Sequence, residues 1–199
     1  MTTHKDARML ATREMALDAA LDILQQEGVL AITHASISAR TGISRSTLYR
    51  HWPKLNQVRY DAFACATRAT QDANVPLRTN GPLRADLTWI LSFLMVALND
   101  MPWGKIAPQV IAAAAIEDEA RKLINGWIQD RKTSVEKVFQ AAIDRGEVSD
   151  NVPLGSLVEM TIAVPYFRKL VAGQQLDQDW LDTHVKIICS TAEKMSDGN

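Results

Sequence analysis

Cysteine is scarce in this chain of 199 residues, which contains only Cys65 and Cys189. The two cysteines lie far apart and form no CxxC pair, so their spacing predicts neither a metal site nor a redox centre. Isolated cysteines of this kind are typical of small buried apolar side chains in a reducing compartment. We therefore expect a protein without a bound metal or cofactor.

Long hydrophobic runs are also missing. The most apolar stretch, residues 89–98, is too short to span a bilayer and includes Ser92. The N-terminus is polar and has no pattern of a secretory signal. These features predict a cytoplasmic protein that does not enter a membrane.

Catalytic motifs are absent as well. The sequence has no HExxH, no glycine-rich phosphate loop and no serine elbow. Its four histidines are scattered at positions 4, 34, 51 and 184. An all-helical enzyme needs a nucleophile with a converging base, or a set of metal ligands, and the spacing indicates neither. We expect a binding protein rather than an enzyme.

The apolar residues recur at helical spacing, and β-branched runs with period two are absent. This pattern favours α-helices over β-strands. The expected helices cover residues 6–27, two short segments within 33–52, then 54–73, 83–99, 105–115, 118–145, 153–172 and 177–194. Two prolines, a glycine and two asparagines gather in residues 74–82, which favours a division into domains 1–75 and 76–199.

Residues 33–52 have the pattern of a helix-turn-helix. Thr33 and Ser44 are each suited to cap the start of a short helix, and Gly42 is suited to end the first one. Leu48 and Trp52 are four residues apart, so they are expected to share the inward face of the second helix. In a DNA-binding protein this second helix lies in the major groove.

Positive charge coincides with this motif. No acidic residue occurs between Glu27 and Asp61, and residues 1–60 hold eight basic and five acidic residues, a net charge of +3. The whole chain is −1, which leaves −4 for the remainder. A basic end on an acidic body favours contact with phosphates. A generic helical hairpin uses the same caps, so a helical protein-interaction module that does not bind DNA remains an alternative.

The run from Thr47 to Pro53, Thr-Leu-Tyr-Arg-His-Trp-Pro, resembles the N-terminal domain of TetR-family transcriptional regulators. The helices expected on either side also fit, and residues 165–173 are similar to the penultimate helix of one subgroup. The resemblance implies an all-α fold of about nine helices, with a three-helix DNA-binding head followed by a larger ligand-binding and dimerising body. It further implies a homodimer whose two recognition helices enter successive major grooves of a palindromic operator. Family members are usually repressors that a small molecule releases from DNA.

The resemblance also implies which side chains meet the double-stranded DNA. The expected contact residues are Thr33, Ser44, Arg45, Ser46, Thr47, Tyr49, Arg50, His51 and Lys54. Arg45 suits either a guanine edge or a phosphate, and the Tyr49 hydroxyl is expected to meet a phosphate. One departure concerns Leu55, because many family members have lysine at that place. Either Lys54 substitutes for that lysine or one phosphate contact is lost.

A pocket for the effector is implied between the fifth and eighth helices. The candidate lining residues are Trp89, Phe93, Trp103, Trp127 and Tyr166, although aromatic residues at helical spacing are usually core. Few charges lie in these stretches, which favours an apolar or aromatic effector.

The last two helices are the expected dimer interface. Their apolar stripes are Leu154, Leu157, Val158, Thr161 and Ile162, followed by Leu181, His184, Val185 and Ile188. Family members pair these helices into a four-helix bundle, but the same stripes also suit the monomer's own core. Pro165 is expected to kink the eighth helix, because it has no N–H to donate to the Thr161 carbonyl.

Overall fold

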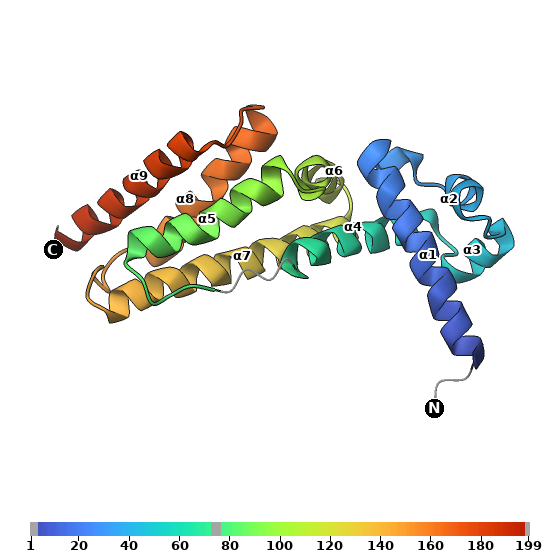
Figure 1. Cartoon of the computed structure of the whole chain (residues 1–199), viewed down its shortest axis with the longest axis horizontal. Coiled ribbons are helices and arrows are strands. Elements are labelled where there is room, and N and C mark those ends of the chain that lie inside the picture. The colour runs from blue at the N-terminus through green and yellow to red at the C-terminus, as the bar shows by residue number, and fades with distance from the viewer. Residues whose placement is uncertain (1–3, 73–76, 198–199) are drawn as a thin grey trace. The chain divides into compact units, whose positions relative to one another are not determined.

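The computed structural model describes the backbone of residues 4–72 and 77–197, and these residues form helices and connecting segments without a β-strand (Figure 1). The all-α prediction is confirmed. The chain divides into two compact units, one of residues 1–72 with 105–124 and the other of residues 73–104 with 125–199. The boundary expected between residues 75 and 76 lies outside the described residues.

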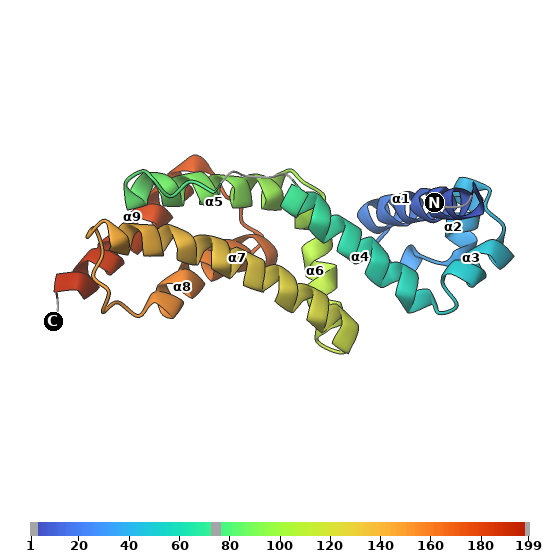
Figure 2. The same ribbon diagram turned by 90° about the horizontal axis from the view of Figure 1, so that it is seen from below.

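The first unit contains the N-terminal helices. They are α1 (His4–Gln26), the short 3-10 helix η1 (Val29–Ala31), α2 (His34–Thr41), α3 (Arg45–His51) and α4 (Leu55–Asp72). Helix α1 packs against α4 and α2, and α2 packs against α3. Figure 2 shows α2 and α3 at one end of this unit. Helices α1 and α4 lie within two residues of their predicted bounds, α2 and α3 fall within residues 33–52 as expected, and η1 was not predicted.

Complete burial of apolar side chains holds the first unit together. Its fully buried residues include Ala16, Ala20, Ile23, Leu24, Ile32, Ile37, Leu48, Val58 and Ala62. Two larger rings, Trp52 and Phe63, are 2% and 1% exposed. Burying a side chain of this size contributes about 1.5–3 kcal/mol, so Leu48 and Trp52 fix which face of α3 turns inward.

The second unit contains the remaining helices. They are α5 (Leu83–Asn99), the start of α6 (Trp103–Ala114), most of α7 (Asp118–Asp144), α8 (Leu154–Tyr166), the π-helix η2 (Phe167–Val171) and α9 (Gln178–Asp197). Helix α5 lies beside α9, and α8 contacts both (Figure 1). No helix in the described ranges has the length and apolar character needed to cross a membrane.

Pro165 lies inside α8, and the structure compensates for the hydrogen bond that it cannot donate. The regular helix ends at Tyr166 and continues as a π-helix. The Thr161 carbonyl accepts a hydrogen bond from His184 Nε2 on α9 at 3.1 Å. Burial lowers the pKa of His184, so its ring is neutral at pH 7 and its role is to satisfy this carbonyl.

Most of the apolar stripes predicted for α8 and α9 lie in the protein's own core. Leu157, Thr161, Leu181, Val185 and Ile188 are each no more than 1% exposed. The structure therefore favours the core alternative for these side chains. A different stripe of α8 and η2 remains exposed instead, formed by Met160, Val164, Phe167 and Val171.

The turn from α5 to α6 depends on Gly104. A Cβ atom built on Gly104 would lie 2.0 Å from the carbonyl oxygen of Leu98, far inside van der Waals contact. Its N–H donates to the Met101 carbonyl at 3.2 Å, which closes the turn. The sequence Met-Pro-Trp-Gly thus ends one helix and begins the next because only glycine fits its last position.

Candidate functional site

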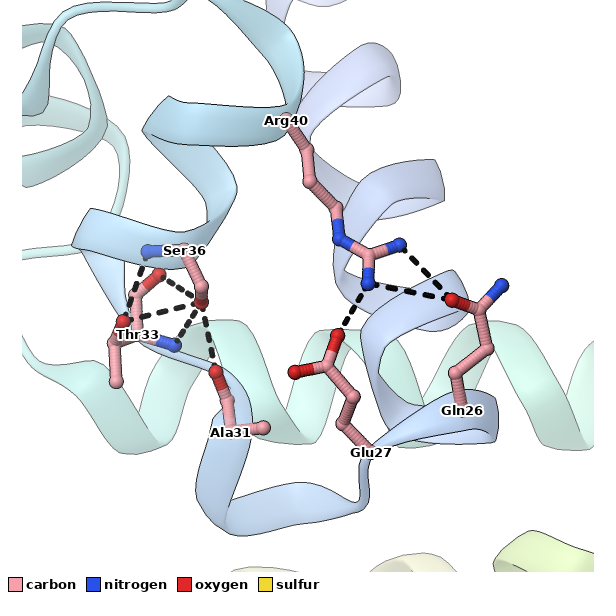
Figure 3. Close-up of polar contacts among 6 residues, drawn as sticks. All are labelled: Gln26, Glu27, Ala31, Thr33, Ser36 and Arg40. Carbon is pink, nitrogen blue, oxygen red and sulfur yellow. Dashed lines mark hydrogen bonds and ion pairs between the residues drawn. The ribbon is translucent and has the colours of Figure 1, made fainter.

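Helix α2 begins with a complete capping box. Thr33 Oγ1 accepts from the Ser36 N–H at 2.9 Å, and Ser36 Oγ accepts from the Thr33 N–H at 3.0 Å (Figure 3). The Ser36 hydroxyl also donates to the Ala31 carbonyl at 2.7 Å. These bonds fix the entry into α2, so capping is the role of the Thr33 hydroxyl in this structure.

Helix α3 is set against α2 by a tight turn. Gly42 has φ of 73°, a left-handed conformation that favours glycine, and its N–H donates to the Ser38 carbonyl at 2.9 Å. Ser44 then caps α3, with its Oγ accepting from the Thr47 N–H at 3.2 Å. The hydroxyls of Ser46 and Thr47 lie 3.0 and 2.9 Å from that of Ser44. Three hydroxyls therefore gather at the start of α3.

The outward face of α3 agrees with the sequence prediction. Arg45, Ser46, Tyr49 and Arg50 are exposed, whereas Leu48 is completely buried. Lys54, just before α4, is also exposed. The predicted contact residues therefore lie along one short segment, with most of their side chains accessible to a ligand.

His34, which the sequence reasoning did not single out, supports Tyr49. The two rings stack with centroids 4.2 Å apart and an interplanar angle of 28°. The Nε2 atom of His34 lies 2.8 Å from the Trp52 carbonyl oxygen, so the imidazole joins α2 to the end of α3. Tyr49 is 53% exposed, so stacking on His34 leaves much of the residue accessible.

Asp61 on α4 anchors the end of α3. Its Oδ2 accepts from the Trp52 indole N–H at 2.7 Å and also pairs with the Arg13 guanidinium of α1. The Arg13 guanidinium carbon lies 5.4 Å from the centroid of the Trp52 ring. Because one carboxylate joins residues of three elements, α3 is held rigidly.

His51 is only partly exposed to solvent. It is half-buried, with its ring centroid 5.6 Å from that of Trp52. Burial lowers the pKa of His51, and the positive charges of Arg50 and Arg13 lower it further. The imidazole is therefore neutral at pH 7 and adds no positive charge to this surface.

The exposed cations differ in whether their charge is already compensated. Arg40 on α2 pairs with Glu27 and also donates to Gln26 Oε1 at 3.3 Å (Figure 3). Within the described part of the chain, Arg45, Arg50 and Lys54 form no ion pair. Uncompensated positive charge therefore gathers on and next to α3. Leu55, at the position where many members of the family that this segment resembles have lysine, is half-buried.

The five aromatic residues predicted to line a pocket fall into two sets of ring contacts. Trp89 and Phe93 of α5 meet edge to face at 5.2 Å, and Trp89 is 37% exposed. In the second set, Trp127 lies 4.8 Å from Trp103 and 5.2 Å from Tyr166. Trp89 also borders an open surface hollow of about 520 Å³, which makes it a surface residue rather than core.

Two family models match separate parts of this chain. Residues 77–188 match the model of the tetracyclin repressor-like C-terminal domain, and residues 16–55 match the model of bacterial regulatory proteins of the tetR family. The chain belongs to the TetR family. This TetR-family protein is thus a helix-turn-helix transcriptional regulator and not an enzyme, and regulators of this family bind DNA and usually dimerise.

Curated relatives are named as regulators of the same kind. The uncharacterized HTH-type transcriptional regulator YdeS of Bacillus subtilis is 22% identical over 171 residues, covering 85% of this chain and 84% of the relative. The HTH-type transcriptional regulator AqdR of Rhodococcus erythropolis is 28% identical over 160 residues, covering 75% of this chain and 73% of the relative.

Solved structures share the fold over most of the chain. A TetR-family regulator from Mesorhizobium loti has a TM-score of 0.73 at 16% identity, covering 92% of this chain and 96% of its own. A regulator from Saccharomonospora viridis, solved in complex with choline, has a TM-score of 0.68 at 15% identity and covers 91% of this chain and 96% of its own. At these identities the likeness shows the fold alone.

The substitution Tyr49→Phe removes the hydroxyl and keeps the ring, so it distinguishes the roles of the two groups. We expect Tyr49→Phe to weaken operator binding about tenfold, because a hydrogen bond to a charged phosphate contributes about 1.5–3 kcal/mol. The melting temperature should stay at the wild-type value, because the ring still stacks on His34. His34→Ala should instead lower the melting temperature. Fluorescence anisotropy and thermal unfolding measure both effects, and wild-type DNA affinity of Tyr49→Phe would contradict the phosphate contact.

Proposed function

We propose that this TetR-family protein binds a palindromic operator as a homodimer, by inserting α3 of each protomer into the major groove. The proposed DNA contacts are Thr33, Ser44, Arg45, Ser46, Thr47, Tyr49, Arg50, His51 and Lys54. Because the proposed partner is DNA, we also propose that the protein acts in the cytoplasm. Repression that an effector relieves is typical of the family, and we propose it here.

One observation carries the DNA-binding mode. Leu48 and Trp52 are buried on one side of α3, while Arg45 and Arg50 are exposed without an ion-pair partner in the described ranges. The buried side chains hold α3 in place, and the exposed arginines present uncompensated positive charge. Docking into the polyanionic groove of DNA requires both features. By contrast, the hydroxyls of Thr33 and Ser44 cap the starts of α2 and α3. These two residues therefore contribute to DNA binding by fixing where the helices begin, and by any hydrogen bond that their hydroxyls can still form with DNA.

The salt dependence of duplex binding tests this mode. Each neutralised phosphate releases counterions, so two docked heads should lose at least about 100-fold in affinity between 50 and 200 mM salt. Fluorescence anisotropy of a labelled duplex gives the slope. Weak binding without a salt dependence would overturn the proposal.

For the homodimer, we propose that the exposed stripe of α8 and η2 forms the interface. Met160, Val164, Phe167 and Val171 are 42%, 40%, 61% and 74% exposed and recur at helical spacing. On α9, Ile187 adds a further exposed apolar side chain. Contiguous exposed apolar residues at such spacing are typical of an interface rather than of a free surface. They support pairing through the last two helices, by faces other than those in the core.

Placing a charge in this stripe should separate the protomers. We expect Phe167→Asp to raise the dimer dissociation constant about 100-fold, because a buried aromatic anchor contributes about 2–4 kcal/mol. Analytical ultracentrifugation measures the change. Ile116→Asp is the matched control, since Ile116 is 83% exposed outside this stripe and should leave dimerisation unchanged. A Phe167→Asp protein that dimerises like wild type would show that the interface lies elsewhere.

The effector site is proposed among Trp89, Phe93, Trp103, Trp127 and Tyr166, and the effector is apolar or aromatic. Within the second unit, the Trp127 ring contacts those of Trp103 and Tyr166, which supports a shared site for three of these five side chains.

A further inference from the structure

One face of α5 borders a surface hollow of about 520 Å³, which we call the α5 hollow. This volume lies within the range of about 300–1,000 Å³ that is typical of small-molecule sites. Leu83, Leu87 and Leu91 of the same helix belong to the core, so the hollow uses a different face of α5. Its lining residues are Arg78, Pro82, Arg84, Ala85, Thr88, Trp89 and Ser92.

Trp89 forms an aromatic wall of the α5 hollow. The residue is 37% exposed, and Phe93 meets its ring edge to face with centroids 5.2 Å apart, which restricts the orientation of the indole. Ala85 lies one helical turn before Trp89 and contributes only a methyl group to the lining. An exposed indole beside a small side chain suits the flat apolar body of an aromatic molecule.

Two arginines bring positive charge to the α5 hollow. Arg78 is held by the completely buried Asp86, whose Oδ1 lies 3.3 Å from Arg78 Nε and whose Oδ2 accepts from the Gly81 N–H at 3.0 Å. Asp86 thus fixes the segment before α5 and compensates the charge of Arg78. Arg84 is exposed and forms no ion pair within the described residues, and none of the described residues that line the hollow is acidic. The charge of Arg84 is therefore uncompensated.

The hydroxyls of the α5 hollow already use their protons within the helix. Thr88 Oγ1 donates to the Arg84 carbonyl at 2.8 Å, and Ser92 Oγ donates to the Thr88 carbonyl at 2.7 Å. The charged donors of the hollow are consequently the guanidinium N–H groups of its two arginines. Guanidinium presents these donors in a planar fork that matches the oxygens of a carboxylate or a phosphate.

We propose that the α5 hollow binds a small aromatic molecule that carries an oxyanion, with its ring against Trp89 and its anionic oxygens on Arg84 and Arg78. A carboxylate and a phosphate share this chemistry, and both are compatible with the donors present. A cationic ligand is excluded, because the uncompensated charge of Arg84 repels it. The inference goes beyond the proposed function, since it gives the hollow a ligand class of its own and requires neither operator binding nor the other predicted effector residues.

Titrations followed by ¹H–¹⁵N spectra test the proposal with probes that share a naphthalene ring. In this series 1-naphthoate and 1-naphthyl phosphate are anions, 1-naphthylmethanol is neutral and 1-naphthylmethylammonium is a cation. Acetate and inorganic phosphate carry an anion without the ring. We expect at least one naphthalene anion to shift the indole N–H signal of Trp89, which Trp89→Phe assigns. Affinity read from that signal should be at least about tenfold higher for this anion than for the neutral, cationic and ringless probes. The two naphthalene anions, compared with each other, distinguish a carboxylate ligand from a phosphate ligand.

Substitutions locate the binding. Arg84→Gln should reduce the preference for the anion over the neutral probe to less than about twofold. Arg168→Gln is the matched control, because Arg168 also lies beside an indole, 5.7 Å from the centroid of Trp180, and should leave the preference intact. Ala85→Leu should occupy the hollow and abolish the shift, while circular dichroism shows the wild-type helix content.

The proposal is overturned if neither naphthalene anion shifts the Trp89 signal, or if the neutral or cationic probe binds as tightly. It is equally overturned if Arg84→Gln keeps the preference, or if a correctly folded Ala85→Leu protein binds like wild type. Operator binding is measured without any probe, so its loss would refute the proposed function and leave this inference standing.

Discussion

Replacing Arg45 by alanine should weaken operator binding about 10- to 100-fold, while the fold and the dimer remain intact. Arg45 is exposed at the start of α3, and it has no ion-pair partner in the described ranges. Loss of a bidentate arginine contact removes about 1–3 kcal/mol of discrimination. Anisotropy titrations on the operator and on single-base variants measure the effect.

The same titrations decide between the two roles that remain open for Arg45. If Arg45 reads a guanine, the variant loses its preference at one base pair and keeps the wild-type salt slope. If Arg45 binds a phosphate, all sequences weaken alike and the salt slope falls by about one. Arg40→Ala is the control, because Arg40 is already paired with Glu27 and should change affinity much less. An Arg45→Ala protein that binds like wild type would refute the contact.

The second large effect concerns stability rather than DNA. Gly104→Ala should lower the free energy of unfolding by about 3 kcal/mol or more, because its Cβ would lie 2.0 Å from the backbone oxygen of Leu98. A backbone atom cannot move aside as a flexible side chain does, so the α5–α6 turn has to open. Urea denaturation followed by circular dichroism measures the loss.

Gly126 provides a matched control within the same unit. It lies inside α7, and a Cβ atom added there would meet nothing within 4 Å. Gly126→Ala should therefore raise the free energy of unfolding by about 0.5–1 kcal/mol, the difference in helix propensity. If Gly104→Ala and Gly126→Ala changed the free energy of unfolding by the same amount, the turn at Gly104 would not be as tight as described.

The helix-turn-helix was predictable because its signals are local. Thr33, Gly42 and Ser44 act within three or four residues of themselves, and the structure has the capping bonds and the left-handed turn that they favour. The spacing of Leu48 and Trp52 likewise predicted which face of α3 is buried. Tertiary packing strengthens these local preferences rather than opposing them.

The features that were missed depend on contacts between residues distant in sequence. No local pattern connects His34 with Tyr49 or His184 with the carbonyl that Pro165 leaves free. Helix α8 carries apolar side chains on more than one face, so its periodicity did not indicate which stripe faces the core. The sequence therefore left open whether the stripe that includes Leu157 faces the core or a second protomer, and the structure buries that stripe and exposes the one that includes Phe167.

The central claim is that α3 reads duplex DNA from its outward face, and selection of bound duplexes from a random pool tests it most directly. The account predicts enrichment of one palindromic motif, with half-site centres about 10–10.5 base pairs apart or at a multiple of that spacing. The enriched duplex should bind Arg45→Ala and Tyr49→Phe more weakly than it binds the wild-type protein. A pool that yields no shared motif after repeated rounds would contradict the account.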